Sequence, residues 1–430
     1  MNEIIITTVI LIFCVVIGVP IASAMGITAI AFIVITDPGN LTAIPLRFFA
    51  GMNSFTLMAL PLFMLAAEIM VKSGISARLF DFVRMGRIGR ARGGLAYVNI
   101  LASVIFGSIS GAALSDVAGV GKIELDAMND DGYPKDFSCA ITGASSIESP
   151  LIPPSNIAIL YAGTMSLSVG AVLYAGVIPG LILAGTQMLY VALNAKRLNL
   201  PKHAKKYEKH ERNLILRDGL IALGMPLIIL VGITTGWFTP TEAAAVAVLY
   251  SLIVGKFVFH KITLQDIKHA LWSSAKTTGN LFMIIGFSNV FGWALGTEQI
   301  PQKLAGFMTS ITDNKYIIML IINIIFLIVG MWMETASAVL LFVPILAPVA
   351  YAVGVNPIQF AVVVIVNLTI GLVTPPVGVV LYAVADVAKE KFEKVVKATM
   401  PFVVLALVTL ILMTLIPELT LFVPRLLGFI

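Results

Sequence analysis

Two proline-broken apolar segments decide the fold of this chain: GASSIESPLIPPSN at residues 143–156 and NLTIGLVTPPVG at residues 367–378. Each contains a Pro-Pro pair and lies within a long hydrophobic run. Proline removes a backbone donor and clashes with the preceding helical turn, so each segment predicts a helix interrupted in mid-membrane. Backbone that is not helical at membrane depth is tolerated where it is protein-buried or lines a wet cavity, which makes both breaks candidate sites.

The composition of the whole chain is that of a membrane protein. Of its 430 residues, 59% are hydrophobic and 12% are charged, whereas a soluble domain is about half apolar and about a quarter charged. The net charge of +5 does not indicate a nucleic-acid partner, because Lys and Arg cluster between apolar stretches, as they do in proteins embedded in a lipid bilayer. Cys14 and Cys139 show neither a disulfide pattern nor a metal pattern. The N-terminal apolar run lacks a basic leader and predicts a first membrane helix.

Apolar runs long enough to cross, or partly cross, a bilayer recur along the chain. Basic residues gather between them at 72–92, 196–217 and 389–397, and the bias of Lys and Arg toward the cytoplasm places all three stretches inside. If 95–121 and 316–350 are re-entrant hairpins, 24 of the 28 Lys and Arg lie inside. We therefore expect a multi-pass membrane protein with both termini on the outer side of the membrane. The runs lie at about 4–19, 21–36, 55–71, 95–121, 137–166, 169–195, 218–236, 242–258, 279–296, 316–350, 357–388 and 398–416.

The two halves match at a nearly constant offset, which indicates an internal duplication. The Pro-Pro pairs at 153–154 and 375–376 lie 222 residues apart, and Gly107 matches Gly330 at an offset of 223. Because the first half starts outside and the second inside, we expect two inverted repeats, an architecture typical of secondary transporters. A chance alignment of common membrane residues is the alternative. The expected division is a first repeat at 1–196 (scaffold helices 1–92, hairpin and broken helix 93–196), a cytoplasmic linker at 197–213 and a second repeat at 214–430 (scaffold helices 214–311, hairpin and broken helix 312–430).

Small and hydroxyl residues gather at the hairpins and breaks, where half-helix ends supply carbonyls for cations and N–H groups for anions. Hard cations prefer oxygen ligands of this kind. We therefore expect a sodium ion at each hairpin and its break, with small-residue packing and ligand-free proline kinks as the alternatives. The expected ligands are Ser108, Ser110, Asp116, Ser145, Ser146 and Ser149 in the first half, and Gly330, Glu334, Thr335, Ser337, Thr369, Gly371 and Thr374 in the second.

Three acids in apolar surroundings are functional candidates, because ionisable groups at membrane depth are costly. Asp116, Glu148 and Glu334 could balance sodium charge or relay protons, and helix capping or local pairing is an equally open interpretation. Glu242 differs, because TPTE at 239–242 fits a capping box with proline at the first helical position. The four histidines form no catalytic arrangement with Ser or Asp, so the sequence does not favour an enzyme.

Several motifs resemble the large membrane subunit of TRAP transporters, the tripartite ATP-independent periplasmic family. They are GWFTPTEAAA at 236–245, GSISG at 107–111, PILAP at 344–348 and the two Pro-Pro breaks. The resemblance covers essentially the whole chain. It implies an all-α polytopic membrane protein of the ion-transporter superfamily, with a scaffold, an elevator-like transport domain and coupling to two or more Na+ ions.

The same resemblance implies partners and a substrate. The partners are a soluble periplasmic binding protein and a small four-helix membrane subunit, which we expect to be a separate chain because no extra helices precede the first repeat. The substrate is a small organic anion, in this family mostly a carboxylate such as a C4-dicarboxylate or a sialic acid, and the chain is most similar to the sialic acid members.

We expect half-helix N-termini and backbone N–H groups to bind the substrate anion, because no arginine in the transport core is placed to bind a carboxylate. A second hypothesis is a stand-alone sodium- or proton-coupled carboxylate or anion permease of the same superfamily, which needs no binding protein. A third is a membrane scaffold that transports nothing. The residues expected to contact substrate are Ser108, Ser149, Pro154, Thr374 and Pro376.

Overall fold

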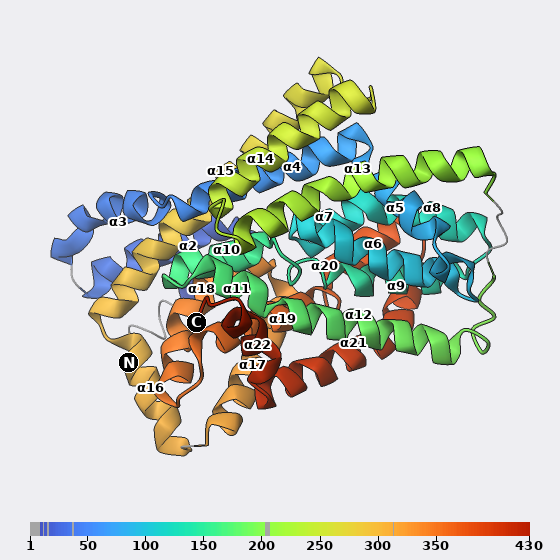
Figure 1. The fold of residues 1–430 in the computed structure, drawn as a ribbon. Coiled ribbons are helices and arrows are strands. Elements are labelled where there is room, and N and C mark those ends of the chain that lie inside the picture. Colours follow the sequence, from blue (N-terminus) through green and yellow to red (C-terminus); the bar gives the residue numbers. More distant parts are fainter. Residues whose placement is uncertain (1–8, 12, 15–16, 37, 203–206, 313) are drawn as a thin grey trace.

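The structure is a computed structural model that describes residues 9–11, 13–14, 17–36, 38–202, 207–312 and 314–430, with the side chains of 108–110 and 311 outside that description. The elements named in these ranges are all helical (Figure 1). Eight described helical segments are long and apolar enough to cross a membrane. The chain is therefore an all-helical, polytopic membrane protein, as its composition predicts.

Helices from the start of each half pack together into one bundle. Helix α4 lies along α14 and α15, and α15 also contacts α2 and α3. Figure 1 shows α15 beside α14 and α4, although 190 residues separate α4 from α15 in sequence. The elements are α2 (Ile21–Thr36), α3 (Ala43–Met52), α4 (Ala59–Ser73), α5 (Ile75–Met85), α13 (Lys209–Thr234), α14 (Pro240–Ile253), α15 (Leu264–Thr297) and α16 (Ile300–Ile311).

Capping boxes set the first residues of α14 and α15. At the start of α14, the N–H of Glu242 donates to Thr239 Oγ1 at 3.3 Å, and the N–H of Thr239 donates to Glu242 Oε2 at 2.8 Å. The structural role predicted for Glu242 is confirmed. Thr263 and Asp266 form a second capping box. Because this cap starts the helix early, α15 begins before the apolar run predicted at 279–296.

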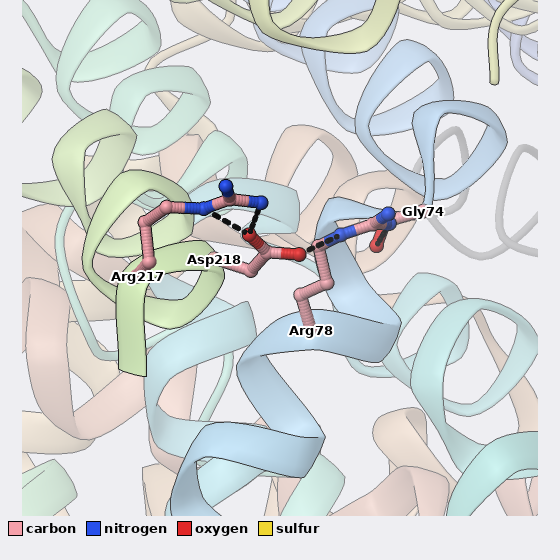
Figure 2. A network of polar contacts seen from close by, with 4 residues as sticks. All are labelled: Gly74, Arg78, Arg217 and Asp218. Carbon is pink, nitrogen blue, oxygen red and sulfur yellow. Dashed lines mark hydrogen bonds and ion pairs between the residues drawn. The ribbon is translucent and has the colours of Figure 1, made fainter. Parts of the chain in front are cut away.

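A charged network joins α5 to α13 (Figure 2). Asp218 accepts from Arg217 Nη2 at 2.8 Å through Oδ1 and from Arg78 Nε at 3.2 Å through Oδ2. Arg78 also donates to the carbonyl oxygen of Gly74, and its guanidinium lies 3.7 Å from the centroid of the Phe259 ring. These contacts hold α5, the helix that leads into the first hairpin, against the bundle.

Two helical hairpins and two broken helices complete the fold, where the sequence predicts them. The hairpins turn at 111–112 and 333–334, and the breaks span 147–155 and 373–378. The helices are α6 (Gly94–Ser110), α7 (Ala113–Asp116), η4 (Val117–Gly121), α8 (Lys122–Asp130), α9 (Lys135–Ser146), α10 (Asn156–Met165), α11 (Val169–Ala175), α12 (Val177–Asn194), α17 (Lys315–Trp332), α18 (Thr335–Ala352), α19 (Pro357–Leu372), α20 (Val379–Ala388), α21 (Phe392–Leu415) and α22 (Glu418–Leu426).

Three segments differ from the predicted apolar runs. The first hairpin continues beyond residue 121 as α8, because acidic helix formers lower its hydropathy without ending the helix. The run predicted at 169–195 is divided at Gly176, where a Cβ would lie 2.3 Å from the carbonyl oxygen of Leu151 in the first break. The amphipathic helix α22 is too short and too polar to be marked by an apolar run.

Candidate functional site

Each hairpin packs on its own broken helix with backbone against backbone. A Cβ at Gly107 would lie 2.5 Å from the Cα of Ser149. A Cβ at Gly330 would lie 2.9 Å from the carbonyl oxygen of Leu368 and 3.3 Å from the Cα of Gly371. Neither position has room for a side chain, so glycine allows the hairpin to reach the break and brings backbone carbonyls to the contact.

The turn of the first hairpin lies against the first break. Gly111 has a φ of +59°, which glycine adopts readily. A Cβ at Gly111 would lie 2.5 Å from the backbone nitrogen of Asn156 and 3.1 Å from the carbonyl oxygen of Pro154. Ser155 caps α10 by accepting from the N–H of Ala158 at 3.1 Å. The positive end of α10 therefore lies at the first hairpin turn.

A ladder of buried polar side chains joins α6 to α9. Asn99 donates from Nδ2 to Thr142 Oγ1 at 2.7 Å and accepts at Oδ1 from Ser145 Oγ at 2.9 Å. The Ser145 hydroxyl also lies 2.9 Å from that of Ser103. All four side chains are buried. A satisfied polar network in a core favours one arrangement of the packed helices, so this ladder fixes the first hairpin on its break.

Three buried carboxyl groups lie near this ladder. Asp116, Glu124 and Glu148 are each at most 2% exposed and lie close enough to interact electrostatically. Asp116 lies against the hydroxyls of Ser103 and Ser149. Both oxygens of Glu148, and one each of Asp116 and Glu124, have no hydrogen-bond partner among the described residues. Because buried acids are costly unless they are paired, this cluster suits a bound cation or protons.

The second hairpin meets its break through amides. Asn367 donates from Nδ2 to the carbonyl oxygen of Asn323 at 2.8 Å and to its Oδ1 at 3.1 Å. Asn323 in turn donates to Thr414 Oγ1 at 3.0 Å. Within the described part of the chain, the Oδ1 of Asn367 and the Oγ1 of Thr335 have no partner. Neutral oxygens of this kind can bind a hard cation without adding negative charge.

Glu334 caps α18 at the turn of the second hairpin. Its Oε2 accepts from the N–H groups of Ala336 at 3.0 Å and Ser337 at 3.3 Å. The geometry therefore agrees with the capping interpretation of this acid. Glu334 also lines a cavity, so its capping role does not exclude contact with a ligand.

The other predicted ligands lie at the same two places. The side chains of Ser108 and Ser110 lie outside the described residues, although their backbone belongs to α6. Four of the predicted hydroxyls donate to backbone carbonyls, which leaves their lone pairs for a cation. These bonds run from Ser146 to Gly143, from Ser149 to Ser103, from Thr369 to Val366 and from Thr374 to Ile370.

The two breaks differ in exposure. Both Pro-Pro bonds are cis. Residues 147–155, which include Pro154, are all buried, whereas Thr374 is half-buried and Pro376 is exposed. Of the predicted substrate contacts, Ser149 and Pro154 in the first half are therefore buried, whereas Thr374 and Pro376 in the second half are more accessible.

A cavity of about 420 Å³ lies between the hairpin turns and the α4–α15 bundle. Ala112 and Ser115 of the first hairpin, Asn156 at the start of α10 and Glu334 of the second hairpin line one wall, and Glu68 of α4 contributes to the other. Small-molecule sites are typically found at such meeting points of two structural units. The cavity thus joins residues from both halves of the chain.

Sequence reasoning missed Asn99, Ser103, Glu124 and Asn323, which the structure places at the hairpin–break contacts. Asn99 precedes Gly107 by eight residues and Asn323 precedes Gly330 by seven. A polar residue at membrane depth, placed about two turns before the hairpin glycine, was the signal available in both halves.

Helices that span a membrane, two hairpins packed on two broken helices and a cavity between bundles define a membrane transporter. The family described as "Tripartite ATP-independent periplasmic transporter, DctM component" matches residues 8–419. The chain belongs to this family. It is therefore a large permease subunit of a tripartite transporter and not an enzyme.

Individual relatives carry several substrate names. The sialic acid TRAP transporter large permease protein SiaM of Vibrio cholerae is 37% identical over 412 residues, covering 95% of each chain. The C4-dicarboxylate TRAP transporter large permease protein DctM of Pseudomonas aeruginosa is 36% identical, covering 94% of each. The isethionate TRAP transporter permease protein DctMQ of Oleidesulfovibrio alaskensis is 35% identical, covering 95% of this chain and 64% of that protein.

The fold is also shared with a more distant transporter of known structure. The YdaH transporter of Alcanivorax borkumensis superposes with a TM-score of 0.63, at 14% identity, over 88% of each chain. This likeness concerns the fold alone.

Proposed function

We propose that the chain is the permease subunit of a sodium-coupled tripartite importer that carries a small organic anion across the bacterial inner membrane. The substrate is a carboxylate, with sialic acid as the leading candidate, delivered by a soluble periplasmic binding protein. A small four-helix membrane subunit, as a separate chain, completes the complex, and both termini face the periplasm. The proposal is carried by the two hairpin turns, which pack on two broken helices and line one cavity.

Matched contacts in the two halves support the inverted repeats. Gly107 meets Ser149 and Gly330 meets Gly371, and each pair of matched residues is offset by 222 or 223 residues. Two equivalent hairpin–break contacts are expected of a duplicated unit and are not expected of a chance alignment.

The oxygen atoms at these contacts fit sodium. Buried acid oxygens at the first contact, and an amide and a hydroxyl oxygen at the second, have no hydrogen-bond partner in the described part of the chain. In the first half, Asp116, Ser145, Ser149 and Glu148 would hold the ion. In the second half Thr335, Asn367 and the backbone around Gly330 and Gly371 would do so. Bound sodium would supply positive charge beside the cavity and help to attract an anion.

The anion itself would contact helix ends. The N-terminus of α10 lies at the first hairpin turn, where Ser155 caps it, and helix N-termini favour negative charge. Among the described residues that line the cavity there is no Lys, Arg or His. A carboxylate would therefore depend on backbone N–H groups and on neighbouring sodium.

An elevator mechanism is part of this proposal, and the two walls of the cavity support it. One wall belongs to the α4–α15 bundle and the other to the two hairpins and to α10. A solute held between two such units can be moved across the membrane if one slides against the other. The division of the chain into scaffold and transport parts remains a prediction.

Uptake into proteoliposomes tests the proposal and its alternatives. The permease, reconstituted with its small subunit, should accumulate N-acetylneuraminate only with an inward sodium gradient and with the periplasmic binding protein outside. Accumulation without the binding protein would favour a stand-alone permease. A protein that accumulates no organic anion under any gradient would favour the membrane scaffold.

A further inference from the structure

The wall of the cavity formed by α4 and α15 is polar. Ser274, Thr277 and Asn280 of α15 line it at three-residue intervals and thus share one helix face. Ser274 is 6% exposed, and its Oγ has no hydrogen-bond partner among the described residues. A buried hydroxyl that lines a cavity and lacks a partner is available to a ligand.

Glu68 faces the same space from α4 in a fixed position. Its Oε1 accepts from Ser273 Oγ at 3.0 Å, which links α4 to α15 beside the cavity. A carboxylate has about four lone-pair sites, so one bond leaves most of its capacity unused. Hydroxyl groups of a solute are suitable donors, and hydrogen bonds to an ionised acceptor are stronger than neutral ones.

The charge of the cavity disfavours a second carboxylate on the solute. Glu68 and Glu334 are the charged side chains among the described residues that line it. Glu334 is compensated by the N-terminus of α18, which it caps. For Glu68, the described residues that line the cavity include no Lys, Arg or His. A carboxylate placed beside Glu68 would meet like charge in a partly desolvated space, whereas a hydroxyl would meet an acceptor.

We infer that Glu68 is a specificity-determining residue, which makes this permease select a hydroxyl-rich acid with a single carboxylate over a C4-dicarboxylate. The single carboxylate lies at the hairpin turns, and the hydroxylated part contacts Glu68, Ser274, Thr277 and Asn280. This inference rests on the proposed function, because it concerns the same cavity, and it assigns the α4–α15 wall a part in recognition.

Equilibrium binding to the permease and its small subunit in nanodiscs, with saturating sodium, tests this inference. The probes are N-acetylneuraminate and succinate, measured separately and in competition. The unmodified protein should bind N-acetylneuraminate at least tenfold more tightly. Glu68→Gln should lower the ratio of the two affinities at least fivefold, because it weakens the binding of N-acetylneuraminate and strengthens the binding of succinate. Glu68→Asp should restore part of the ratio.

Matched variants separate recognition from structure. Ser274→Ala should lower the affinity for N-acetylneuraminate by about threefold, which corresponds to less than about 1 kcal/mol, and should leave the affinity for succinate unchanged. Glu393→Gln, which removes an exposed acid at the start of α21, should leave both affinities unchanged. If Glu68→Gln weakened the binding of both probes equally, or if the unmodified protein preferred succinate, the inference would be overturned while the proposed function would stand. Binding of neither probe would overturn the proposed function together with it.

Discussion

The two hairpin–break contacts share a backbone design but differ in chemistry. The first is sealed and carries three buried carboxyl groups, with four of their oxygens unpartnered in the described residues. The second joins two asparagines, and its Pro376 is exposed. The same backbone arrangement thus surrounds buried acids in the first half and neutral oxygens in the second. The comparison suggests that charge compensation and access are divided between the halves.

The largest effect should come from removing the backbone contact that both halves share. Gly330→Ala and Gly371→Ala would each place a Cβ within 3 Å of opposing backbone, so we expect a loss of about 1–3 kcal/mol of stability and of all transport. Thermal unfolding in detergent measures the first effect and vesicle uptake the second.

The control for this prediction is Gly296→Ala. A Cβ at Gly296 meets nothing within 4 Å, and alanine is favoured over glycine in a helix by about 1 kcal/mol. Equal melting temperatures for Gly371→Ala and Gly296→Ala would contradict the close approach.

The second-largest effect should come from the buried acids, which distinguish the first hairpin–break contact from the second. Glu148→Gln removes a buried acid whose two oxygens have no described partner, so the folded state should lose no stability in sodium-free buffer. Sodium-driven uptake should nevertheless fall at least tenfold. Glu393→Gln is the charge-matched control at an exposed position. Retention of normal sodium-driven uptake by Glu148→Gln would exclude the acid cluster from coupling.

The third effect concerns access. In a chain that carries Cys14→Ser and Cys139→Ser, a cysteine introduced by Pro376→Cys should react rapidly with a soluble maleimide, because Pro376 is exposed. The equivalent change in the first half, Pro154→Cys, should react at least tenfold more slowly, because Pro154 is buried. Saturating sodium should slow the labelling of Pro376→Cys. Equal rates at both positions would remove the difference between the breaks.

Sequence alone predicts the hairpins and breaks because prolines and clustered glycines act locally on the backbone. It also points to Ser145 and Ser149, which hydrogen-bond to Asn99 and Ser103 of α6, and their role as ligands stays a prediction. The exposure of Pro376 and the burial of Pro154 could not be predicted, because they depend on how distant helices cover each break.

Asn99, Glu124 and Asn323 escaped prediction for a related reason. A single polar residue in an apolar helix does not reveal which neighbour it faces until the helices are packed. The cavity wall on α4 and α15 combines Glu68 with residues more than 200 positions later, a juxtaposition that no local pattern encodes.

The smallest effect should appear in the turn between α20 and α21, which follows the second broken helix. Glu390 accepts from the N–H of Lys391 at 2.9 Å and pairs with Lys394 at 3.4 Å. The Lys391 N–H is the main cause that lowers the pKa of the Glu390 carboxyl below its ordinary value of 4.5. Because the folded-state pKa is lowered, the stabilisation is present above pH 4.5 and is lost as the pH falls through the lower, folded-state value.

Thermal unfolding from pH 7 to pH 3 checks this prediction. Glu390→Gln should melt slightly below the unmodified protein at neutral pH, and the two curves should converge in acid. The first half has no equivalent, because α10 and α11 are joined by the uncharged residues 166–168. A difference that grows in acid would contradict the assigned sign.

Counting bound sodium tests the central claim most directly. Purified permease in nanodiscs should bind at least two ²²Na⁺ ions at saturation, and Glu148→Gln should bind one fewer while keeping the remaining site. Asn367→Leu should remove the other site and leave the first. An unmodified protein that binds no sodium, or a Glu148→Gln variant that binds as many ions as the unmodified protein, would contradict the account.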